Sequence, residues 1–217
     1  KVEAAKYMDE LSPAAQIIGA VNTIVNDDGK LTGYITDGEG FVNNLKDHGI
    51  DIKGRKITVA GGGGAATAIQ VQCALDGARE ITIFNKKDDF FERTLETAEK
   101  IRKAVPECVV NVYDIDDVAK MTEEIKSSDI FANATIVGMK PLDDQSVVKD
   151  TSAFRPGLVV ADAVYNPQET KLLREAKEAG CTCIGGKGML LWQGVAAFKL
   201  YTGQDMPVDE VKELYFK

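Results

Sequence analysis

Four consecutive glycines are the residues of this chain whose type and spacing point most directly to chemistry. They follow a short β-branched run and lead into a helix-like segment of small residues. A buried strand, a turn without side chains and a helix N-terminus together form a pyrophosphate site, because backbone N–H groups and the helix dipole both face the phosphates. The candidate phosphate-binding residues are Gly61, Gly62, Gly63, Gly64 and Ala65.

The spacing of these residues fits a dinucleotide-binding turn. Gly61, Gly63 and Ala66 match G-x-G-x-x-A, a variant of the dinucleotide fingerprint. No Lys-Ser or Lys-Thr pair follows the glycines, which argues against a nucleotide-triphosphate P-loop. An ordinary glycine turn is the alternative interpretation. The strand pattern before the turn and the helical pattern after it favour the dinucleotide.

The residues after the next predicted strand, 80–84, are suited to binding an adenosine ribose. At this place a nucleotide fold uses an acidic residue for the 2′-OH of NAD or basic residues for the 2′-phosphate of NADP. Lys86 and Lys87 favour the phosphate, whereas Asp88 favours a free ribose, and Asn85 precedes them. We therefore expect NAD or NADP, with NAD slightly favoured. The alternative is a solvated turn with a helix N-cap at Asp88 or Asp89.

Composition and charge exclude several other classes of protein. The net charge of −8 (26 basic against 34 acidic residues) argues against a nucleic-acid-binding surface. No apolar run approaches the ~18 residues of a membrane span, and no signal peptide is present, so we expect a cytoplasmic protein. His48 is the only histidine and is predicted to lie on the surface at a helix end, which argues against a histidine triad or metal site. We expect buried free thiols and no metal at Cys73, Cys108, Cys181 and Cys183.

Strand-like and helix-like segments alternate along most of the chain, which predicts an α/β fold. The strands are expected at 20–25, 31–35, 56–60, 80–84, 108–113, 129–132, 158–162 and 182–184. The helices are expected at 2–17, 37–47, 65–76, 89–104, 116–126, 169–179, 188–201 and 207–215. The last six strands, with helices between them, indicate a Rossmann-type doubly wound parallel sheet. Ligand would then bind at the carboxyl ends of the strands, near the reversal of strand order.

Several separate motifs occur in one order along the chain. They are Gly19-Ala20-Val21-Asn22-Thr23, Thr36-Asp37-Gly38, the glycine turn, Asn133-Ala134-Thr135 and Gly188-Met189-Leu190-Leu191-Trp192-Gln193-Gly194. Together they resemble the shikimate dehydrogenase family over the whole chain. Three further motifs resemble the quinate/shikimate dehydrogenase branch of this family. They are Asn85-Lys86-Lys87-Asp88-Asp89-Phe90-Phe91, Val137-Gly138-Met139-Lys140-Pro141 and Val164-Tyr165-Asn166-Pro167.

The resemblance implies a fold and a reaction. The family oxidises a ring hydroxyl of shikimate or quinate to the 3-dehydro ketone with NAD or NADP. It consists of an N-terminal α/β substrate domain and a C-terminal Rossmann domain. We therefore expect a remnant of the substrate domain at 1–36 and the cofactor domain at 37–187. The helices of 188–217 would pack back on the remnant, and a homodimer is compatible with the family.

The resemblance also assigns roles to residues. Lys1, eight residues before Asp9-Glu10-Leu11, matches the family's catalytic lysine, and Asp37 matches its partner. Hydride leaves a carbon for the nicotinamide while the hydroxyl proton goes to a base, a role that this pair can fill. The implied substrate-binding residues are Asn22, Gln193 and Tyr165. The implied further cofactor-binding residues are Thr135, Val164, Asn166 and Gly186.

Simpler roles remain open for the matched residues. Lys1 could be a frayed terminal residue, and Asp37 could only cap the helix that starts there. Asn22 could only close a turn. Gln193 is harder to explain as a core residue, because a buried amide needs hydrogen-bond partners.

One departure from the family limits what we expect of this chain. The Ser-x-Ser motif that holds the substrate carboxylate would lie upstream of Lys1 and is absent from the sequence. We therefore expect the chain to bind NAD with impaired or absent turnover. The alternatives are a strictly NADP-dependent biosynthetic shikimate dehydrogenase and a module that only binds nucleotide.

Overall fold

The larger of two sheets has six parallel strands and fixes the architecture. A computed structural model describes residues 1–88 and 91–216. The strand order is β6-β5-β4-β7-β8-β9, so the order reverses between β4 and β7. The bounds are β4 Lys56–Ala60, β5 Glu80–Asn85, β6 Val109–Asp114, β7 Ile130–Asn133, β8 Val159–Asp162 and β9 Thr182–Ile184. This confirms the predicted Rossmann-type sheet.

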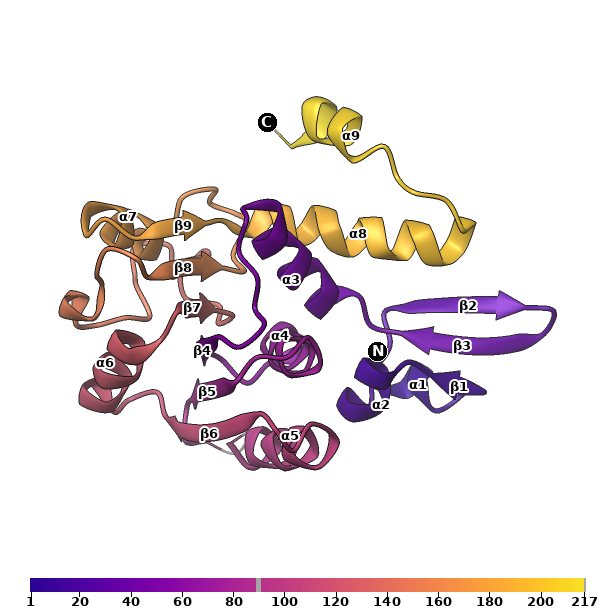
Figure 1. The fold of residues 1–217 in the computed structure, drawn as a ribbon, viewed down its shortest axis with the longest axis horizontal. Coiled ribbons are helices and arrows are strands. Elements are labelled where there is room, and N and C mark those ends of the chain that lie inside the picture. Colours follow the sequence, from indigo (N-terminus) through magenta and orange to yellow (C-terminus); the bar gives the residue numbers. More distant parts are fainter. Residues whose placement is uncertain (89–90, 217) are drawn as a thin grey trace.

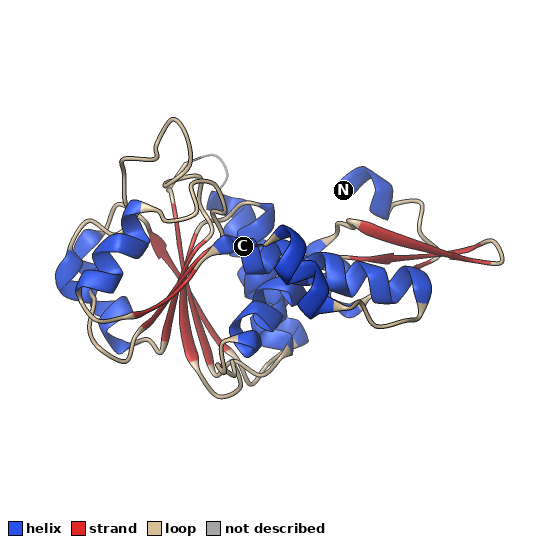
Figure 2. Cartoon of the chain, turned by 90° about the horizontal axis from the view of Figure 1, so that it is seen from above, coloured by secondary structure: helices blue, strands red, loops and turns tan. Residues whose placement is uncertain are grey.

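Helices cover both faces of this sheet, which Figure 2 shows edge-on between two helical layers. One buried cluster joins the sheet to α4 and α5, and a second joins it to α6 and α7. The bounds are α4 Gly64–Leu75, α5 Phe91–Ala104, α6 Val118–Ser127 and α7 Lys171–Glu178, with a short 3-10 turn η1 at Thr151–Ala153. The strands are apolar on both faces, as parallel strands covered on both sides require.

The N-terminal residues form a separate three-stranded sheet of order β1-β3-β2. Its hairpin turns at Asp28 and Gly29, both at positive φ, as the sequence predicts for this turn. The elements are α1 Val2–Ala5, β1 Glu10–Leu11, α2 Pro13–Ile18, β2 Thr23–Asp27 and β3 Lys30–Tyr34. The hairpin projects away from the large sheet (Figures 1 and 2).

The single opening helix expected at 2–17 is wrong. Pro13 has no N–H to continue a helix, and Ser12 caps a new one by accepting from the N–H of Ala15. The two residues before this cap pair with β3 instead, so the segment reads helix, strand, helix. The first strand of the hairpin also starts at Thr23, three residues after the expected start at 20.

Helix α3 Asp37–Asp47 joins the small sheet to the large sheet along the chain. It packs against a second long helix, α8 Gly186–Thr202. A Cβ on Gly40 of α3 would lie 2.7 Å from both the N of Gln193 and the O of Met189 on α8. The two backbones are therefore in direct contact. The last helix, α9 Val208–Tyr215, turns back over α8 (Figure 1) and is tied to α3 by the ion pair of Lys212 with Asp47. Within the described residues, no helix is both long enough and apolar enough to cross a membrane.

Candidate active site

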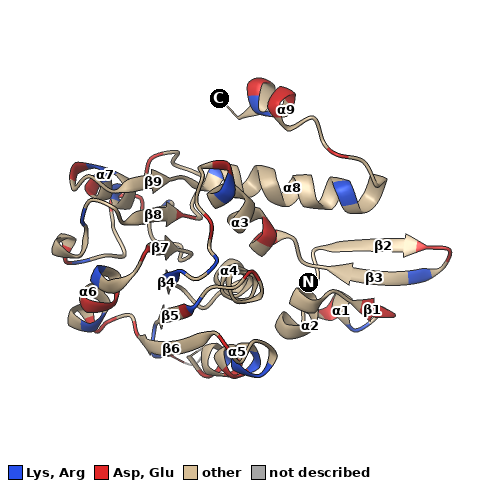
Figure 3. Cartoon of the chain, in the orientation of Figure 1, with Lys and Arg blue, Asp and Glu red and all other residues tan. Residues whose placement is uncertain are grey.

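Lys1 and Asp37 are in contact where the small sheet meets α3. The Nζ of Lys1 donates to Oδ2 of Asp37 at 2.5 Å. The backbone of Lys1 is also held, because its carbonyl accepts from the N–H of Val21. The side chains are 53% and 19% exposed, so the pair faces solvent rather than the core. Figure 3 shows the acidic start of α3 beside the N-terminus.

Asn22 completes a hydrogen-bonded group around Asp37. Its Nδ2 donates to Oδ1 of Asp37 at 3.0 Å and to Oγ1 of Thr36 at 3.1 Å. Its Oδ1 accepts from the N–H of Thr36 at 3.0 Å. The amide of Asn22 is thereby fixed in orientation, and one carboxylate oxygen of Asp37 is left for Lys1.

Gln193 of α8 reaches the same group through Thr36. The hydroxyl of Thr36 lies 3.5 Å from Oε1 of Gln193, whose Nε2 donates to the carbonyl of Leu190. Thr36 is buried, and sequence reasoning did not assign it a role in the site. The sequence feature that could have indicated this role is its position in the motif Thr36-Asp37-Gly38. The structure thus brings Lys1, Asn22, Asp37 and Gln193 together.

The glycine turn lies between β4 and α4, at the carboxyl edge of the large sheet. Gly61 has a φ of +123°, which favours glycine, and its carbonyl accepts from the buried amide of Gln70 at 2.9 Å. A Cβ on Gly62 would lie 2.5 Å from both Asn85 and Thr94. Gly63 and Gly64, in contrast, are exposed and have open space beside them.

These features fit a bound pyrophosphate. Gly63 is the N-cap of α4 and supplies no side-chain cap, so the first-turn N–H groups remain for an anion. Ala65 is exposed in the first turn. The residues that would hold the phosphates are therefore backbone groups, as the sequence predicts for this turn. Gln70, which supports the turn from beneath, was missed because a glutamine on an apolar helix face carries no motif.

The residues of the expected ribose-binding segment differ in how far they are exposed. The Nδ2 of Asn85 donates to Oγ1 of Thr94 at 2.9 Å, so this amide packs against the turn. Lys86, Lys87 and Asp88 are exposed beyond the end of β5. Asp89 and Phe90, which belong to the motif of the quinate/shikimate branch, lie outside the described residues.

Two further loops leave the same edge of the sheet, after β7 and β8. Thr135 follows β7, with its Oγ1 donating to Oδ1 of Asn133 at 2.8 Å. Val164, Tyr165 and Asn166 follow β8, and Tyr165 is 53% exposed. Among the described residues, no hydrogen bond joins Tyr165 to the Lys1–Asp37 group, so its predicted contact with substrate stays a prediction.

The start of α8 lies against the loop after β8. A Cβ on Gly186 would lie 2.5 Å from the carbonyl of Ala163 and 2.6 Å from that of Val164. Gly186 thus permits the N-terminus of α8 to approach the loop that carries the predicted cofactor residues.

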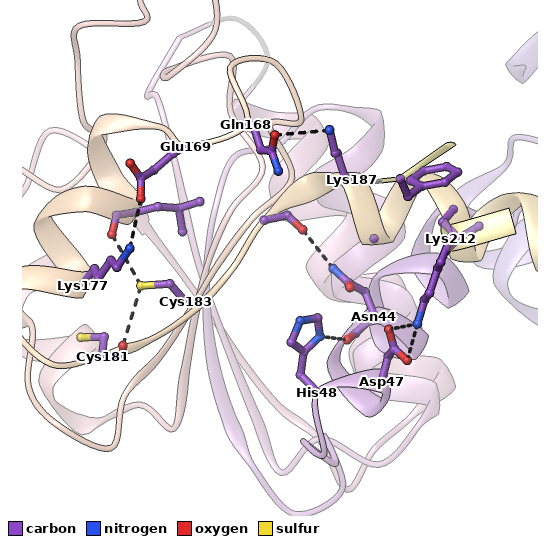
Figure 4. Close-up of a pocket in the computed structure, with 15 residues that line it drawn as sticks. Asn44, Asp47, His48, Gln168, Glu169, Lys177, Cys181, Cys183, Lys187 and Lys212 are labelled. Atoms are coloured by element: carbon purple, nitrogen blue, oxygen red, sulfur yellow. Dashed lines mark hydrogen bonds and ion pairs between the residues drawn. The ribbon is translucent and has the colours of Figure 1, made fainter. Parts of the chain in front are cut away.

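A cavity of about 820 Å³ lies between β9, α3 and α9, and the start of α8 also lines it through Gly185, Lys187 and Gly188 (Figure 4). Its lysines are already paired: Lys177 with Glu169, Lys212 with Asp47, and Lys187 with Gln168. His48 lies exposed at the end of α3, as expected, with Nδ1 2.8 Å from the carbonyl of Asn44.

The cysteines correspond in part to the prediction. All four are free, but only Cys73 and Cys108 are buried, while Cys181 and Cys183 are half-buried because β9 is an edge strand. Burial raises the pKa of each of these thiols, that of Cys108 to about 11. A protonated thiol is a poor nucleophile and metal ligand. The described residues contain no group of three or more His, Cys, Asp or Glu suited to a metal.

The fold and the site define a class of protein. A doubly wound sheet with a dinucleotide-type turn, next to a lysine–aspartate pair, is the arrangement of an NAD(P)-dependent oxidoreductase. The sequence itself is similar to the shikimate 5′-dehydrogenase C-terminal domain over residues 186–214. A shikimate dehydrogenase (NADP(+)) of Listeria monocytogenes serotype 4b (strain F2365) is 52% identical over 211 residues, which cover 97% of this chain and 72% of that protein. The chain belongs to the shikimate dehydrogenase family.

Solved structures agree with this assignment. Shikimate 5-dehydrogenase from Listeria monocytogenes, in complex with shikimate and NAD, has a TM-score of 0.96 at 51% identity, covering 99% of this chain and 74% of that one. Quinate dehydrogenase from Corynebacterium glutamicum, in complex with NAD, has a TM-score of 0.87 at 30% identity, covering 100% of this chain and 74% of that one.

Proposed function

We propose that this chain interconverts shikimate or quinate and the corresponding 3-dehydro ketone with NAD or NADP. The observation that carries the proposal is the 2.5 Å contact between Lys1 and Asp37 at the start of α3, where Gly38 packs against Ala68 of α4, the helix that follows the dinucleotide-type turn. A nicotinamide bound at this site would supply the acceptor for hydride from the hydroxyl-bearing carbon. The hydroxyl proton passes to the lysine side chain, which Asp37 orients.

In this proposal one part of the chain binds the substrate and the other binds the cofactor. Residues 1–36, with the helices of 188–217, would contribute the substrate side, and 37–187 would hold the cofactor. Asn22 and Gln193 would bind ring hydroxyls, since the amide of Asn22 lies beside Asp37 and that of Gln193 lies beside Thr36. Tyr165, exposed on the loop after β8, is proposed as a further substrate-binding residue. Homodimer formation is a further prediction, which light scattering after size-exclusion chromatography checks.

The dinucleotide would lie across the reversal of strand order between β4 and β7. Its pyrophosphate would bind at the glycine turn, and its adenosine would lie toward Lys86, Lys87 and Asp88. The exposed lysines favour a 2′-phosphate and the aspartate a free hydroxyl, so both cofactors are proposed, with NAD slightly favoured. The names of two relatives support this breadth, since one is a shikimate dehydrogenase (NADP(+)) and the other a shikimate 5-dehydrogenase in complex with NAD.

A second candidate function is dinucleotide binding without turnover. The 53% exposure of the Lys1 side chain favours it, because an exposed side chain is held less firmly against a substrate than an enclosed one. A strictly NADP-dependent shikimate dehydrogenase is the alternative within the same reaction.

Two measurements separate these functions. Isothermal titration with NAD and with NADP gives binding, and initial rates with each pair of shikimate or quinate and NAD or NADP give turnover. Reduction of either cofactor supports the proposal. Binding without turnover supports the second candidate. No quinate oxidation, together with at least about a hundredfold preference for NADP (~2.7 kcal/mol), would leave only the NADP-dependent shikimate enzyme.

A further inference from the structure

Asp162, the last residue of β8, is a buried carboxylate with three hydrogen-bond donors. Its Oδ1 accepts from Nδ2 of Asn133 at 2.9 Å and from the N–H of Val164 at 3.0 Å. Its Oδ2 accepts from the hydroxyl of Thr170 at 2.7 Å. The residue is 2% exposed. None of these three hydrogen bonds involves the Lys1–Asp37 group or the glycine turn.

Each donor belongs to a different piece of the carboxyl edge. Asn133 ends β7 and also binds the loop that follows, because its Nδ2 donates to the carbonyl of Val137 and its Oδ1 accepts from the N–H of Thr135. Val164 belongs to the loop after β8. Thr170 is the N-cap of α7, and its Oγ1 accepts from the N–H of Leu173. Asp162 therefore links two loops and a helix start.

Side-chain packing supports the same connection. Gly138, in the loop after β7, has a φ of +106°, and a Cβ there would lie 3.2 Å from Thr170 and 3.8 Å from Val164. The loops after β7 and β8 are thus in contact as well as hydrogen-bonded through Asp162.

The position of this network suggests what it holds. The ribose-binding segment follows β5, on one side of β4, so the other half of a dinucleotide must extend over β7 and β8. That half carries the nicotinamide. The loops joined by Asp162 contain the residues expected at this end, Thr135, Val164 and Asn166.

We propose that Asp162 is a positioning residue that holds the loops after β7 and β8 as one unit, and that this unit orients the nicotinamide. The inference rests on the proposed dinucleotide-binding function. It assigns Asp162 no contact with cofactor or substrate. Its carboxylate acts through Asn133, Thr170 and the backbone of Val164.

The test compares single variants of the whole chain. Asp162→Asn keeps the shape but turns an NH₂ group toward Thr170. Thr170→Val removes the hydroxyl, and Thr170→Ser restores it. Thr58→Val is the matched control, because Thr58 is also fully buried and also loses a 2.8 Å hydroxyl hydrogen bond, to Ser128, away from the carboxyl edge. Thermal unfolding confirms that each variant is folded at the temperature used.

The readouts are fluorescence of bound NADH, which reports the surroundings of the nicotinamide, and amide hydrogen exchange. We expect Asp162→Asn and Thr170→Val to lose at least about half of the emission enhancement, with NADH affinity within about threefold, because the pyrophosphate turn is unchanged. Amides of 134–139 and 163–168 should exchange about tenfold faster, as expected for one lost hydrogen bond. Thr170→Ser and Thr58→Val should resemble the wild type.

Wild-type emission and exchange in both Asp162→Asn and Thr170→Val would overturn the inference, as would equal losses in Thr58→Val. A wild-type chain that binds neither NADH nor NADPH would overturn the proposed function instead. In that case exchange in the unliganded protein still decides whether Asp162 couples the two loops.

Discussion

At the scale of single residues, Asp37 has several partners at once. It begins α3, pairs with Lys1 and accepts from Asn22. The cap considered for Asp37 from the sequence is wrong, because Thr36 is the N-cap of α3 and Asp37 is its first helical residue. A carboxylate in the first turn still suits the helix dipole, and this position is compatible with a chemical role. The same carboxylate that starts the helix can orient the lysine.

Asp37→Asn tests the chemical role without removing the side chain. We expect kcat for shikimate oxidation to fall at least about a hundredfold, because general acid–base catalysis contributes about 10²–10⁴. Dinucleotide affinity should stay within about twofold, since the glycine turn is not touched. Asp47→Asn, at the other end of the same helix, is the control and should keep kcat. Turnover above about a tenth of wild type in Asp37→Asn would contradict the role.

At the residue level, motifs carry the sequence signal. The resemblance predicts roles for Lys1, Asp37, Asn22 and Gln193, and the structure places these side chains in one hydrogen-bonded group, while their roles stay predictions. Thr36, Gln70 and Asp162 received no role, because their importance lies in buried hydrogen bonds between segments distant in the sequence. No local pattern encodes such partners.

At the scale of elements, the glycines of the turn lack side chains for two different reasons, one concerning the fold and the other a bound ligand. Gly61 and Gly62 are required by the protein itself, one by its positive φ and the other by its closeness to Asn85 and Thr94. Gly63 has an ordinary extended backbone and open space beside it. Only a molecule bound there would need Gly63 to lack a side chain.

Gly63→Ala therefore distinguishes a phosphate site from a simple turn. We expect the melting temperature to change little and the dissociation constant for NAD to rise at least about tenfold (~1.4 kcal/mol), because the new methyl group occupies the space where the phosphates approach. Calorimetric unfolding and titration measure the two effects. An alanine variant that binds NAD as the wild type does would show that no phosphate approaches Gly63.

Elements of the large sheet were predicted well from the sequence because each strand is a short apolar run followed by a helical pattern. The opening segment was not, since helical spacing extended through Pro13 and masked the two-residue strand β1. Such a strand exists only through its pairing with β3, which lies about twenty residues further along the chain.

At the scale of the whole molecule, a buried ion network holds the amino ends of the strands, opposite the proposed site. Lys56 contacts Glu124 at 2.7 Å and Glu80 at 2.9 Å, and Lys120 contacts Glu124 at 2.8 Å. The side chains of Lys56 and Glu124 are 9% and 8% exposed. Burial opposes ionisation of Glu124, but hydrogen bonds from Lys120 and Lys56 outweigh it and hold its pKa below the usual value.

Lys56→Met should destabilise the protein by about 3–5 kcal/mol at pH 7, because it leaves buried carboxylates with fewer partners. Because the pKa of Glu124 is lowered on folding, its contribution is full above the unfolded value of about 4.3 and is lost as pH falls through the folded pKa. The acid-induced loss of stability should therefore be smaller in Lys56→Met.

Urea unfolding between pH 7 and pH 3 measures both effects. Lys46→Met, which removes an exposed 3.8 Å contact with Asp76, is the control and should cost less than about 1 kcal/mol. NAD binding should persist in both variants. Equal costs for the two substitutions would contradict the network's role.

The backbone contact between α3 and α8 at Gly40 has a mechanical consequence. Asp37 and Gln193 belong to these two helices, so they must move together when the sheets move relative to each other, whereas the backbone of Lys1 is bound to Val21 beside the small sheet. Any opening or closing of the molecule is then recorded directly as a change in the Lys1–Asp37 separation. A pair of spin or fluorescent labels on the hairpin and on α3 would follow that motion without touching a residue of the site.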